Sequence, residues 1–250
     1  MKIFGLIGYP VSHSFSKDYF SDKFRKENII DAKYELFPLE NIEDFPEIIT
    51  RNPDLAGLNV TIPYKERIIR YLDNIDETAA DVGAVNTIKV IRDTEGVRLD
   101  GYNTDVFGFR RSLEPFLSES HKKALILGTG GAAKAVRYVL TSLNIEYISA
   151  SIEELGENEI RYPDITSDIM KTHLVIINAT PLGMFPDTGT FPDIPYDLLT
   201  KDHILYDLVY NPKETAFLRF GIQANTKTIN GIPMLHLQAE RSWEIWNTKE

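Results

Sequence analysis

A glycine-rich turn at residues 128–133 has the spacing of a dinucleotide-binding loop. Its sequence, GTGGAA, fits the pattern G-x-G-x-x-[G/A], with Ala133 in the last place. Gly128 would permit a tight turn, Gly130 would let a diphosphate approach the backbone, and Ala133 would let the following helix pack closely. The N–H groups and the positive dipole end at the start of that helix favour an anion. The pattern therefore predicts a dinucleotide site rather than a plain strand-to-helix turn.

Two serines and a Lys–Asp combination are further candidates for chemistry. Ser14 and Ser16 each offer a hydroxyl donor, although a serine just before a helix can also act as its cap. Lys65 follows a strand-like run and a proline turn, from which an amine can project into a cleft, and Asp105 is a carboxylate that can pair with it. Taken alone, such a combination is more often a surface salt bridge. The choice between a functional role and a helix cap or surface salt bridge therefore depends on the surrounding motifs.

The elements around the glycine turn are those that a dinucleotide site requires. Residues 123–127 are a short apolar run suited to a buried strand, and a helical pattern with one apolar face follows the turn. Other strands are expected at residues 2–7, 32–37, 55–60, 85–91, 97–99, 146–149, 174–178 and 204–208. Other helices are expected at residues 16–28, 42–49, 66–72, 76–82, 106–117 and 233–246.

This order of elements predicts an α/β fold in two domains. Strands that alternate with helices favour parallel sheets, and the residues at 93–96, DTEG, predict one hairpin. One α/β unit precedes the glycine turn and a second one begins with it. We therefore expect a cleft between two domains, which is where small ligands commonly bind.

Composition narrows the class of protein. The chain has 250 residues, 43% of them hydrophobic, which is enough for a sizeable core. Its formal charge of −10 argues against nonspecific nucleic-acid binding. It has no cysteine, which excludes disulfides and thiolate chemistry, and its five histidines, His13 among them, lack metal-ligand spacing, so no metal is expected. The sequence shows neither a signal peptide nor a membrane span, so a cytoplasmic protein is expected.

Seven polar segments that contain Gly or Pro give the chain a family resemblance. They are GYPVSHSFS at 8–16, NVTIPYK at 59–65, GAVNT at 83–87, GYNTD at 101–105, NATPLGM at 178–184, DLVYNP at 207–212 and GIPMLHLQA at 231–239. In this order and at these spacings they resemble the shikimate dehydrogenase family, essentially end to end. The resemblance implies reversible NADPH-dependent reduction of 3-dehydroshikimate to shikimate, in the pathway to chorismate and the aromatic amino acids.

The resemblance also implies domains and substrate-side roles. Residues 1–104 with 233–250 would form a substrate-binding catalytic domain, and residues 105–232 a Rossmann-like NADP-binding domain. Lys65 would be the acid/base and Asp105 its partner, because exchange between a ketone and an alcohol needs a proton donor or acceptor beside the hydride carrier. Ser14 and Ser16 would bind the substrate carboxylate. The remaining substrate-side positions are Thr61, Asn86, Tyr210 and Gln238.

The cofactor-side residues implied by the resemblance lie in several loops. They are Gly128, Gly130, Gly131, Ala132, Ser149, Ala150, Thr180, Leu208 and Gly231. About 20 residues past a glycine loop, an acid selects NAD and an Arg favours NADP. The family typically has Asn-Arg-Thr there, whereas this chain has Ser149-Ala150-Ser151 followed by Ile152-Glu153-Glu154.

The missing arginine bears directly on the choice between NADP and NAD. NADP is expected, with weaker discrimination than usual and with NAD left open. Lys134 or Arg161 can supply charge if the fold brings either near, while Glu153 and Glu154 would oppose a phosphate. Ala150→Arg is expected to move the preference toward NADP.

Two other functions stay open on the sequence. A quinate/shikimate dehydrogenase of broader substrate and cofactor specificity would share nearly every residue named above. A non-catalytic dinucleotide-binding sensor would use the same scaffold, but retention of Lys65 and Asp105 argues against it. The expected partners are small molecules rather than nucleic acid or membrane, and the chain is expected to be a monomer or homodimer.

Overall fold

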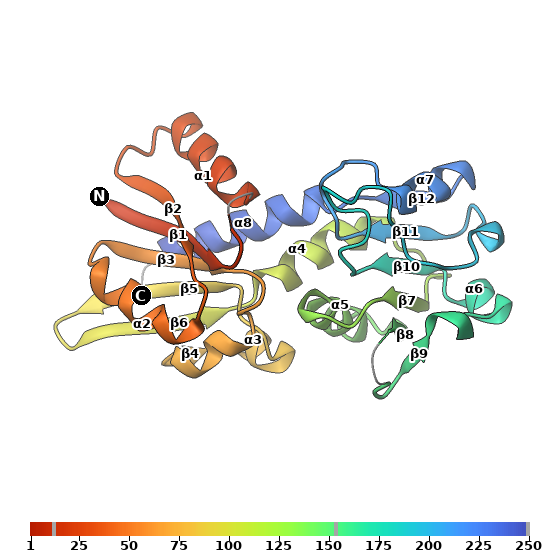
Figure 1. Cartoon of the computed structure of the whole chain (residues 1–250), viewed down its shortest axis with the longest axis horizontal. Helices are drawn as coiled ribbons and strands as arrows, with labels where there is room; N and C mark the ends of the chain where they lie inside the picture. The colour runs from red at the N-terminus through yellow and green to blue at the C-terminus, as the bar shows by residue number, and fades with distance from the viewer. Residues whose placement is uncertain (12–13, 153–154, 249–250) are drawn as a thin grey trace. The chain divides into compact units, whose positions relative to one another are not determined.

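The chain divides into two compact units. The computed structural model describes residues 1–11, 14–152 and 155–248 (Figure 1). One unit comprises Met1–Thr104 with Ala239–Glu250, and the other comprises Asp105–Gln238. The C-terminal helix α8 (Ile232–Asn247) therefore contributes to both units, and residues 233–238, which the sequence groups with the first domain, group here with the second unit.

The first unit is built on a mixed six-stranded sheet with the order β2-β1-β3-β5-β6-β4. Its strands are β1 (Lys2–Gly8), β2 (Ala32–Pro38), β3 (Leu55–Val60), β4 (Asn74–Ile75), β5 (Thr87–Asp93) and β6 (Gly96–Tyr102). Strands β1, β2 and β3 are parallel, but β5 and β6 form the predicted hairpin and pair antiparallel. Asp93 closes the turn by accepting hydrogen bonds from the N–H groups of Glu95 and Gly96. A tight turn makes consecutive strands antiparallel, so this sheet is not purely parallel as the alternation suggested.

Helices cover both faces of this sheet. Helix α1 (Phe15–Lys26) and the end of α8 pack on one face through an aromatic cluster that includes Phe4, Phe20 and Trp246. Helices α2 (Phe45–Arg51) and α3 (Glu77–Val82) cover the other face, with 3₁₀ turns at Ile42–Asp44 and Arg67–Tyr71. Trp246 donates a hydrogen bond to the carbonyl of Ile88 at 2.9 Å, which ties α8 to β5.

The second unit contains an all-parallel sheet with the order β12-β11-β10-β7-β8-β9. Its strands are β7 (Lys123–Leu127), β8 (Glu146–Ser151), β9 (Glu159–Arg161), β10 (Val175–Asn178), β11 (Ile204–Asp207) and β12 (Lys227–Ile229). In chain order this is the doubly wound arrangement of dinucleotide-binding domains, with the topological switch between β7 and β10. Ligands of such sheets bind outside the carboxyl ends of the strands at that switch.

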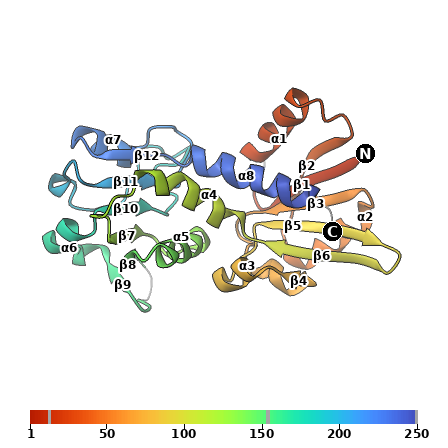
Figure 2. The same cartoon turned by 180° about the vertical axis from the view of Figure 1, so that it is seen from behind.

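Helices again form layers on each side of this sheet (Figure 2). Helices α4 (Thr104–Leu113) and α5 (Gly131–Ser142), with the start of α8, pack on one face. Helices α6 (Ser167–Thr172) and α7 (Ala216–Gln223) pack on the other. Short 3₁₀ turns occur at Glu114–Phe116, Tyr162–Asp164 and Tyr196–Leu198.

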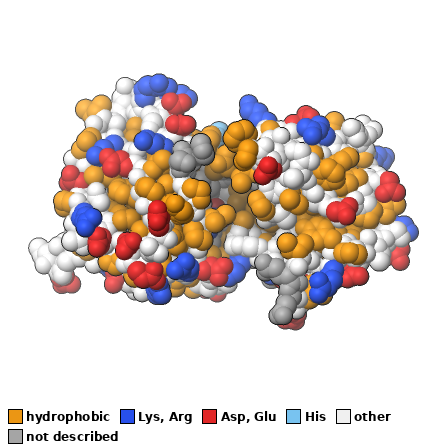
Figure 3. All heavy atoms as spheres, in the orientation of Figure 1, with side chains coloured by type: hydrophobic (Ala, Val, Ile, Leu, Met, Phe, Trp, Pro, Cys, Tyr) orange, Lys and Arg blue, Asp and Glu red, His pale blue; other side chains and the backbone are white. Residues whose placement is uncertain are grey.

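Three surface properties bear on the class of protein. Among the described residues, no helix is long and apolar enough to cross a membrane, and no group of three or more His, Cys, Asp or Glu side chains could hold a metal ion. On the face seen in Figure 3, basic and acidic side chains of the described residues are interspersed. This face therefore lacks the continuous basic surface that nucleic-acid binding uses.

Candidate functional site

The glycine turn has the geometry that its sequence predicts. Gly128 has φ +100°, a conformation that favours glycine, and its N–H donates to the carbonyl of Ala150 at 2.9 Å. Gly130 is the N-cap of α5 and offers no side chain to cap it, while Ala133 is fully buried against the sheet. A Cβ added to Gly130 or Gly131 would meet no protein atom within 4 Å. The start of this 12-residue helix is therefore an open cradle, which fits a diphosphate on its N–H groups.

Two neighbouring loops close around the turn. A Cβ on Gly128 would lie 2.8 Å from Thr180, so the loop after β10 packs directly against the glycine. Leu208 donates its N–H to the carbonyl of Asn178, and Gly231 lies so close to Leu208 that any side chain would overlap the Leu208 carbonyl. The structure thus brings the predicted Thr180, Leu208 and Gly231 to the carboxyl edge that carries the glycine turn.

A buried Asn–Asp–Thr network holds these loops, and residue-type reasoning did not single it out. Asn178 donates to Asp207 at 2.9 Å, and Thr215 donates to the other carboxylate oxygen at 2.5 Å. Asn178 also accepts from the hydroxyl of Thr180 at 2.6 Å. Burial raises the pKa of Asp207 to about 6, in spite of these hydrogen bonds. Asn178 and Asp207 open two of the motifs quoted above, so the sequence signal was their place at strand ends.

The end of β8 differs from the sequence expectation. The strand continues to Ser151 instead of ending at Ser149, so Ser149 and Ala150 lie inside it with 0% of their surface exposed. Ile152, at 86% exposed, is the first accessible side chain past the strand. An Arg at position 150 would place a charge in the apolar core. The substitution that probes cofactor choice therefore belongs at Ile152, not at Ala150. Glu153 and Glu154 lie outside the described residues.

In the first unit, Ser14 and Ser16 stand at the start of α1. Ser14 is the N-cap, and its Oγ accepts from the N–H of Ser16 at 3.2 Å. That bond uses an oxygen lone pair and leaves the hydroxyl proton available for a ligand. Ser16 hydrogen-bonds the buried Tyr34, whose hydroxyl donates to Asn59 at 2.8 Å. Of the two serines, Ser14 is thus the cap of α1. His13 lies outside the described residues.

A tight turn after β3 positions Lys65. The N–H of Tyr64 donates to the carbonyl of Thr61, and the fully buried Tyr64 hydroxyl contacts the carbonyls of Leu39 and Glu40 at 2.6 and 2.7 Å. The carbonyl of Lys65 accepts from the N–H of Val85 at 2.7 Å. This bond fixes the Lys65 main chain beside the loop that carries Asn86, and Lys65 itself is half-buried.

The orientation of the Asn86 amide follows from its contacts. The backbone N–H of Thr104 lies 2.7 Å from Oδ1 of Asn86, and an N–H can only donate, so this atom is the oxygen. Within the described part of the first unit, nothing accepts a hydrogen bond from Nδ2 of Asn86. The amide is therefore held by one end, and its donor end is left for a ligand.

The Asn86 contacts extend into a buried network that the sequence did not reveal. Asn59 donates to Ser242 at 3.0 Å, and Ser242 lies 2.7 Å from the hydroxyl of Thr87. Thr104 contacts both Thr87 and Ser242 at 3.2 Å. Asn59, Thr87 and Thr104 belong to the quoted motifs, but Ser242 carries no signal in the sequence. This network joins α8 to the ends of β3 and β5.

Three predicted site residues belong to the second unit. Asp105 is the first residue of that unit, in the first turn of α4, and is 8% exposed. Gln238 donates to the carbonyl of Leu235 at 2.8 Å, on the part of α8 that packs closely on Gly108. Tyr210 is half-buried after β11, and burial raises its pKa.

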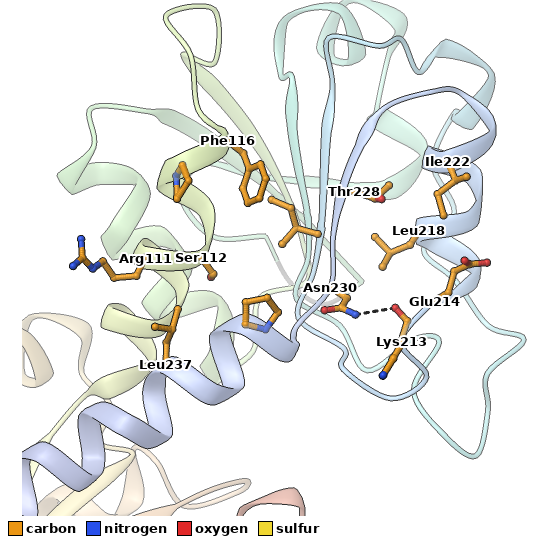
Figure 4. Close-up of a pocket in the computed structure, with 13 residues that line it drawn as sticks. Arg111, Ser112, Phe116, Lys213, Glu214, Leu218, Ile222, Thr228, Asn230 and Leu237 are labelled. Atoms are coloured by element: carbon orange, nitrogen blue, oxygen red, sulfur yellow. Dashed lines mark hydrogen bonds between the residues drawn. The ribbon is translucent and has the colours of Figure 1, made fainter. Parts of the chain in front are cut away.

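None of the predicted site residues lines a pocket of about 630 Å³ in the second unit (Figure 4). Pro115, Leu218 and Thr228 are among its lining residues, and it sits over the edge strand β12. The charged ends of Arg111 and Glu214 point away from the pocket. These two charges therefore do not converge on the pocket.

Fold and site together define a two-unit α/β protein with a dinucleotide-type turn in one unit and the predicted Lys65, Asn86, Ser14 and Ser16 in the other. Residues 6–88 match the family model described as the shikimate dehydrogenase substrate binding domain. A shikimate dehydrogenase (NADP⁺) of Methanococcus maripaludis is 40% identical, over 100% of this chain and 92% of that protein.

Two solved structures show the same likeness. A shikimate dehydrogenase in complex with NADP⁺ has a TM-score of 0.85 and 34% identity, over 100% of this chain and 91% of that one. A quinate dehydrogenase of Corynebacterium glutamicum in complex with NAD has a TM-score of 0.85 and 25% identity, over 98% and 93% of the two chains. This chain belongs to the shikimate dehydrogenase family.

Proposed function

We propose that this chain catalyses the reversible NADPH-dependent reduction of 3-dehydroshikimate to shikimate. The observation that supports the proposal most strongly is that one chain contains both a candidate dinucleotide site and a candidate acid/base. One is the open glycine cradle at the switch point of a doubly wound sheet. The other is Lys65, whose main chain is bonded beside an Asn86 amide with its donor end available. Membership of the family, over the full length of the chain, supports the same reaction.

The proposed substrate roles follow from the chemistry of each side chain. The hydroxyls of Ser14 and Ser16 donate to the substrate carboxylate, near the positive end of α1, and Ser16 would exchange its hydrogen bond to Tyr34 for this one. Thr61 and Asn86 hold ring hydroxyls, together with Gln238 and Tyr210 of the second unit. Lys65 gives a proton to the carbonyl oxygen during reduction and takes it back during oxidation, and Asp105 is proposed as its carboxylate partner.

The proposed cofactor roles rest on the cradle at α5. NADP, when bound, supplies or accepts the hydride, and the protein binds and orients it. Gly130, Gly131 and Ala132 would place N–H groups at the diphosphate, and the loops of Thr180, Leu208 and Gly231 would flank it. We also propose a cytoplasmic enzyme that is a monomer or homodimer, which native mass measurement of the purified protein tests for the assembly.

The test of the residue assignment is the Lys65→Ala variant. Loss of general acid–base catalysis should lower kcat for shikimate roughly 10²-fold or more, with a smaller effect on KM. Lys89→Ala is the matched control and should retain kcat, because it removes a lysine on β5 whose ammonium donates to the carbonyl of Thr248 within the described part of the chain. Near-normal turnover by a folded Lys65→Ala protein would refute the role of Lys65. Turnover of quinate in place of shikimate would favour the broader dehydrogenase.

A further inference from the structure

Neither the end of β8, Ser149-Ala150-Ser151, nor the residue after it, Ile152, supplies the arginine that the family typically has for the 2′-phosphate of NADP. The register of the next strand points to a substitute. Ser151, the last residue of β8, pairs with Arg161, the last residue of β9, in the parallel ladder. Arg161 therefore stands at the same carboxyl edge as the glycine turn, one strand beyond β8.

The face on which Arg161 lies can be fixed from its neighbours. Ile160 packs with the core under α6 and α7, so the residues on either side of it face α5. Glu159 confirms this, because its carboxylate pairs with Arg137 of α5 at 2.7 Å. Arg161 is thus on the α5 side, two residues nearer to the carboxyl edge of the sheet than Glu159, which pairs with Arg137. This is the side on which α5 presents its N-terminus.

Among the described residues of this face, Arg161 is a cation whose charge no carboxylate neutralises. Arg137 is paired with Glu159, which also accepts from the N–H of Gly156 at 3.1 Å, and these contacts lower the pKa of Glu159. Glu159 is therefore compensated without Arg161. Within the described part of the second unit, the exposed Arg161 guanidinium has neither a hydrogen-bond nor an ion-pair partner.

The connection between β8 and β9 bears on whether the face of β9 that carries Arg161 is covered. It spans only residues 152–158, whereas a crossover between parallel strands that contains a helix takes about a dozen residues or more. Among the described residues of this connection, 152 and 155–158, no helix covers the α5-side face of β9.

We infer that Arg161 determines the preference for NADP in this chain, by binding the 2′-phosphate beside Ser151 from β9 instead of from the position after β8. The inference rests on the proposed function, because it assigns a residue to the cofactor of that reaction. A guanidinium suits this task, since it is always charged and can make two parallel hydrogen bonds to a phosphate.

The test uses fragments of the cofactor, so that it does not depend on turnover. Calorimetry should measure the binding of adenosine 2′,5′-bisphosphate and of adenosine 5′-monophosphate to the wild-type protein and to Arg161→Gln. A charged hydrogen bond to phosphate predicts that Arg161→Gln weakens binding of the bisphosphate at least about tenfold and leaves the monophosphate unchanged. Arg161→Lys should recover part of the loss. Arg219→Gln, an exposed arginine of α7 in the same unit, should bind both fragments as the wild type does.

Each outcome separates this inference from the proposed function. If Arg161→Gln keeps the wild-type preference for the bisphosphate, the inference is wrong, while shikimate turnover with NADP by the wild type would still support the function. If the wild type itself has no preference for the bisphosphate, the inference is also wrong. A parallel fall in the ratio of kcat/KM with NADP to that with NAD, specific to Arg161→Gln, would support it.

Discussion

At the scale of single residues, the site side chains are held by hydrogen bonds that leave one defined group available. Asn86 is fixed through its oxygen, and Ser14 caps α1 through a lone pair while it keeps its proton. Ser14 therefore has one observed role, stabilisation of the helix start, and one proposed role, donation to a carboxylate, and one substitution removes both. An experiment can separate the two roles, because another helix cap that lies outside the site should affect stability alone.

Ser14→Ala should raise KM for shikimate about tenfold or more, because a hydrogen bond to a charged carboxylate is lost. It should also lower the free energy of unfolding by about 1 kcal/mol, the usual cost of a lost cap. Asp76→Ala is the matched control, since Asp76 caps α3 by accepting from Ala79 at 3.0 Å. The control should lose stability and keep KM. Steady-state kinetics with urea unfolding measures both, and an unchanged KM in Ser14→Ala would leave capping as its only role.

Asp207 makes stability depend on pH in an unusual direction. Burial raises its pKa from 3.8 to about 6, so the folded state binds more protons than the unfolded state between these values. Its contribution to stability therefore falls as pH rises through this window, by up to about 3 kcal/mol. Asp207→Asn should gain stability relative to the wild type between about pH 4 and about pH 7, as measured by urea unfolding. A constant difference between the two proteins over that range would show that the Asp207 carboxylate does not titrate there.

At the scale of elements, the glycine at the start of α5 is explained by ligand binding and not by packing within the protein. A Cβ at Gly130 would touch nothing within 4 Å, and its φ of −68° is accessible to any residue, so neither packing nor backbone strain requires glycine there. Gly130→Ala should therefore keep the free energy of unfolding or raise it slightly, while binding of NADP weakens about tenfold or more through overlap with the diphosphate. Gly189→Ala, at another open position, is the control and should change neither quantity. Unchanged NADP affinity in Gly130→Ala would place the diphosphate elsewhere.

The elements also show what the sequence could and could not predict. Residues 123–127 and 55–60 are strands as predicted, because a continuous apolar run bounded by turn residues is a strong signal. The strands β9 and β12 have three residues each, too few to show a period, and were not predicted. The two-residue error at the end of β8 had a larger consequence, since it moved the accessible position from Ala150 to Ile152. Tertiary pairing with β9, which no local pattern reports, extends that strand.

The candidate site was predictable where a motif carried it. The glycine turn, Lys65 and Asn86 all lie in segments whose residue types predict a turn or a polar strand end. Ser242 could not be found in this way, because a serine within a helix carries no local signal, and only folding brings it to Thr87 and Asn59. The orientation of the Asn86 amide likewise depends on Thr104, which is distant in sequence.

At the scale of the whole molecule, the residues proposed for the substrate and those proposed for the dinucleotide lie mainly in different compact units. The first unit carries the serines, Lys65 and Asn86, and the second carries the glycine cradle, with α8 contributing to both. Hydride transfer needs substrate and dinucleotide together, so activity is a property of the full chain. The two units make separable contributions, because changes in the first should affect shikimate and changes at the cradle should affect NADP.

The most direct test of this account is the rate at which the purified chain reduces NADP⁺ when shikimate is added, followed by the absorbance of the reduced nicotinamide. The account predicts shikimate-dependent reduction, faster with NADP⁺ than with NAD⁺ and faster than with quinate at equal concentration. Omission of shikimate should abolish it. A folded protein that binds NADP⁺ and yet shows no shikimate-dependent reduction with either cofactor would contradict the account and favour a non-catalytic dinucleotide-binding protein.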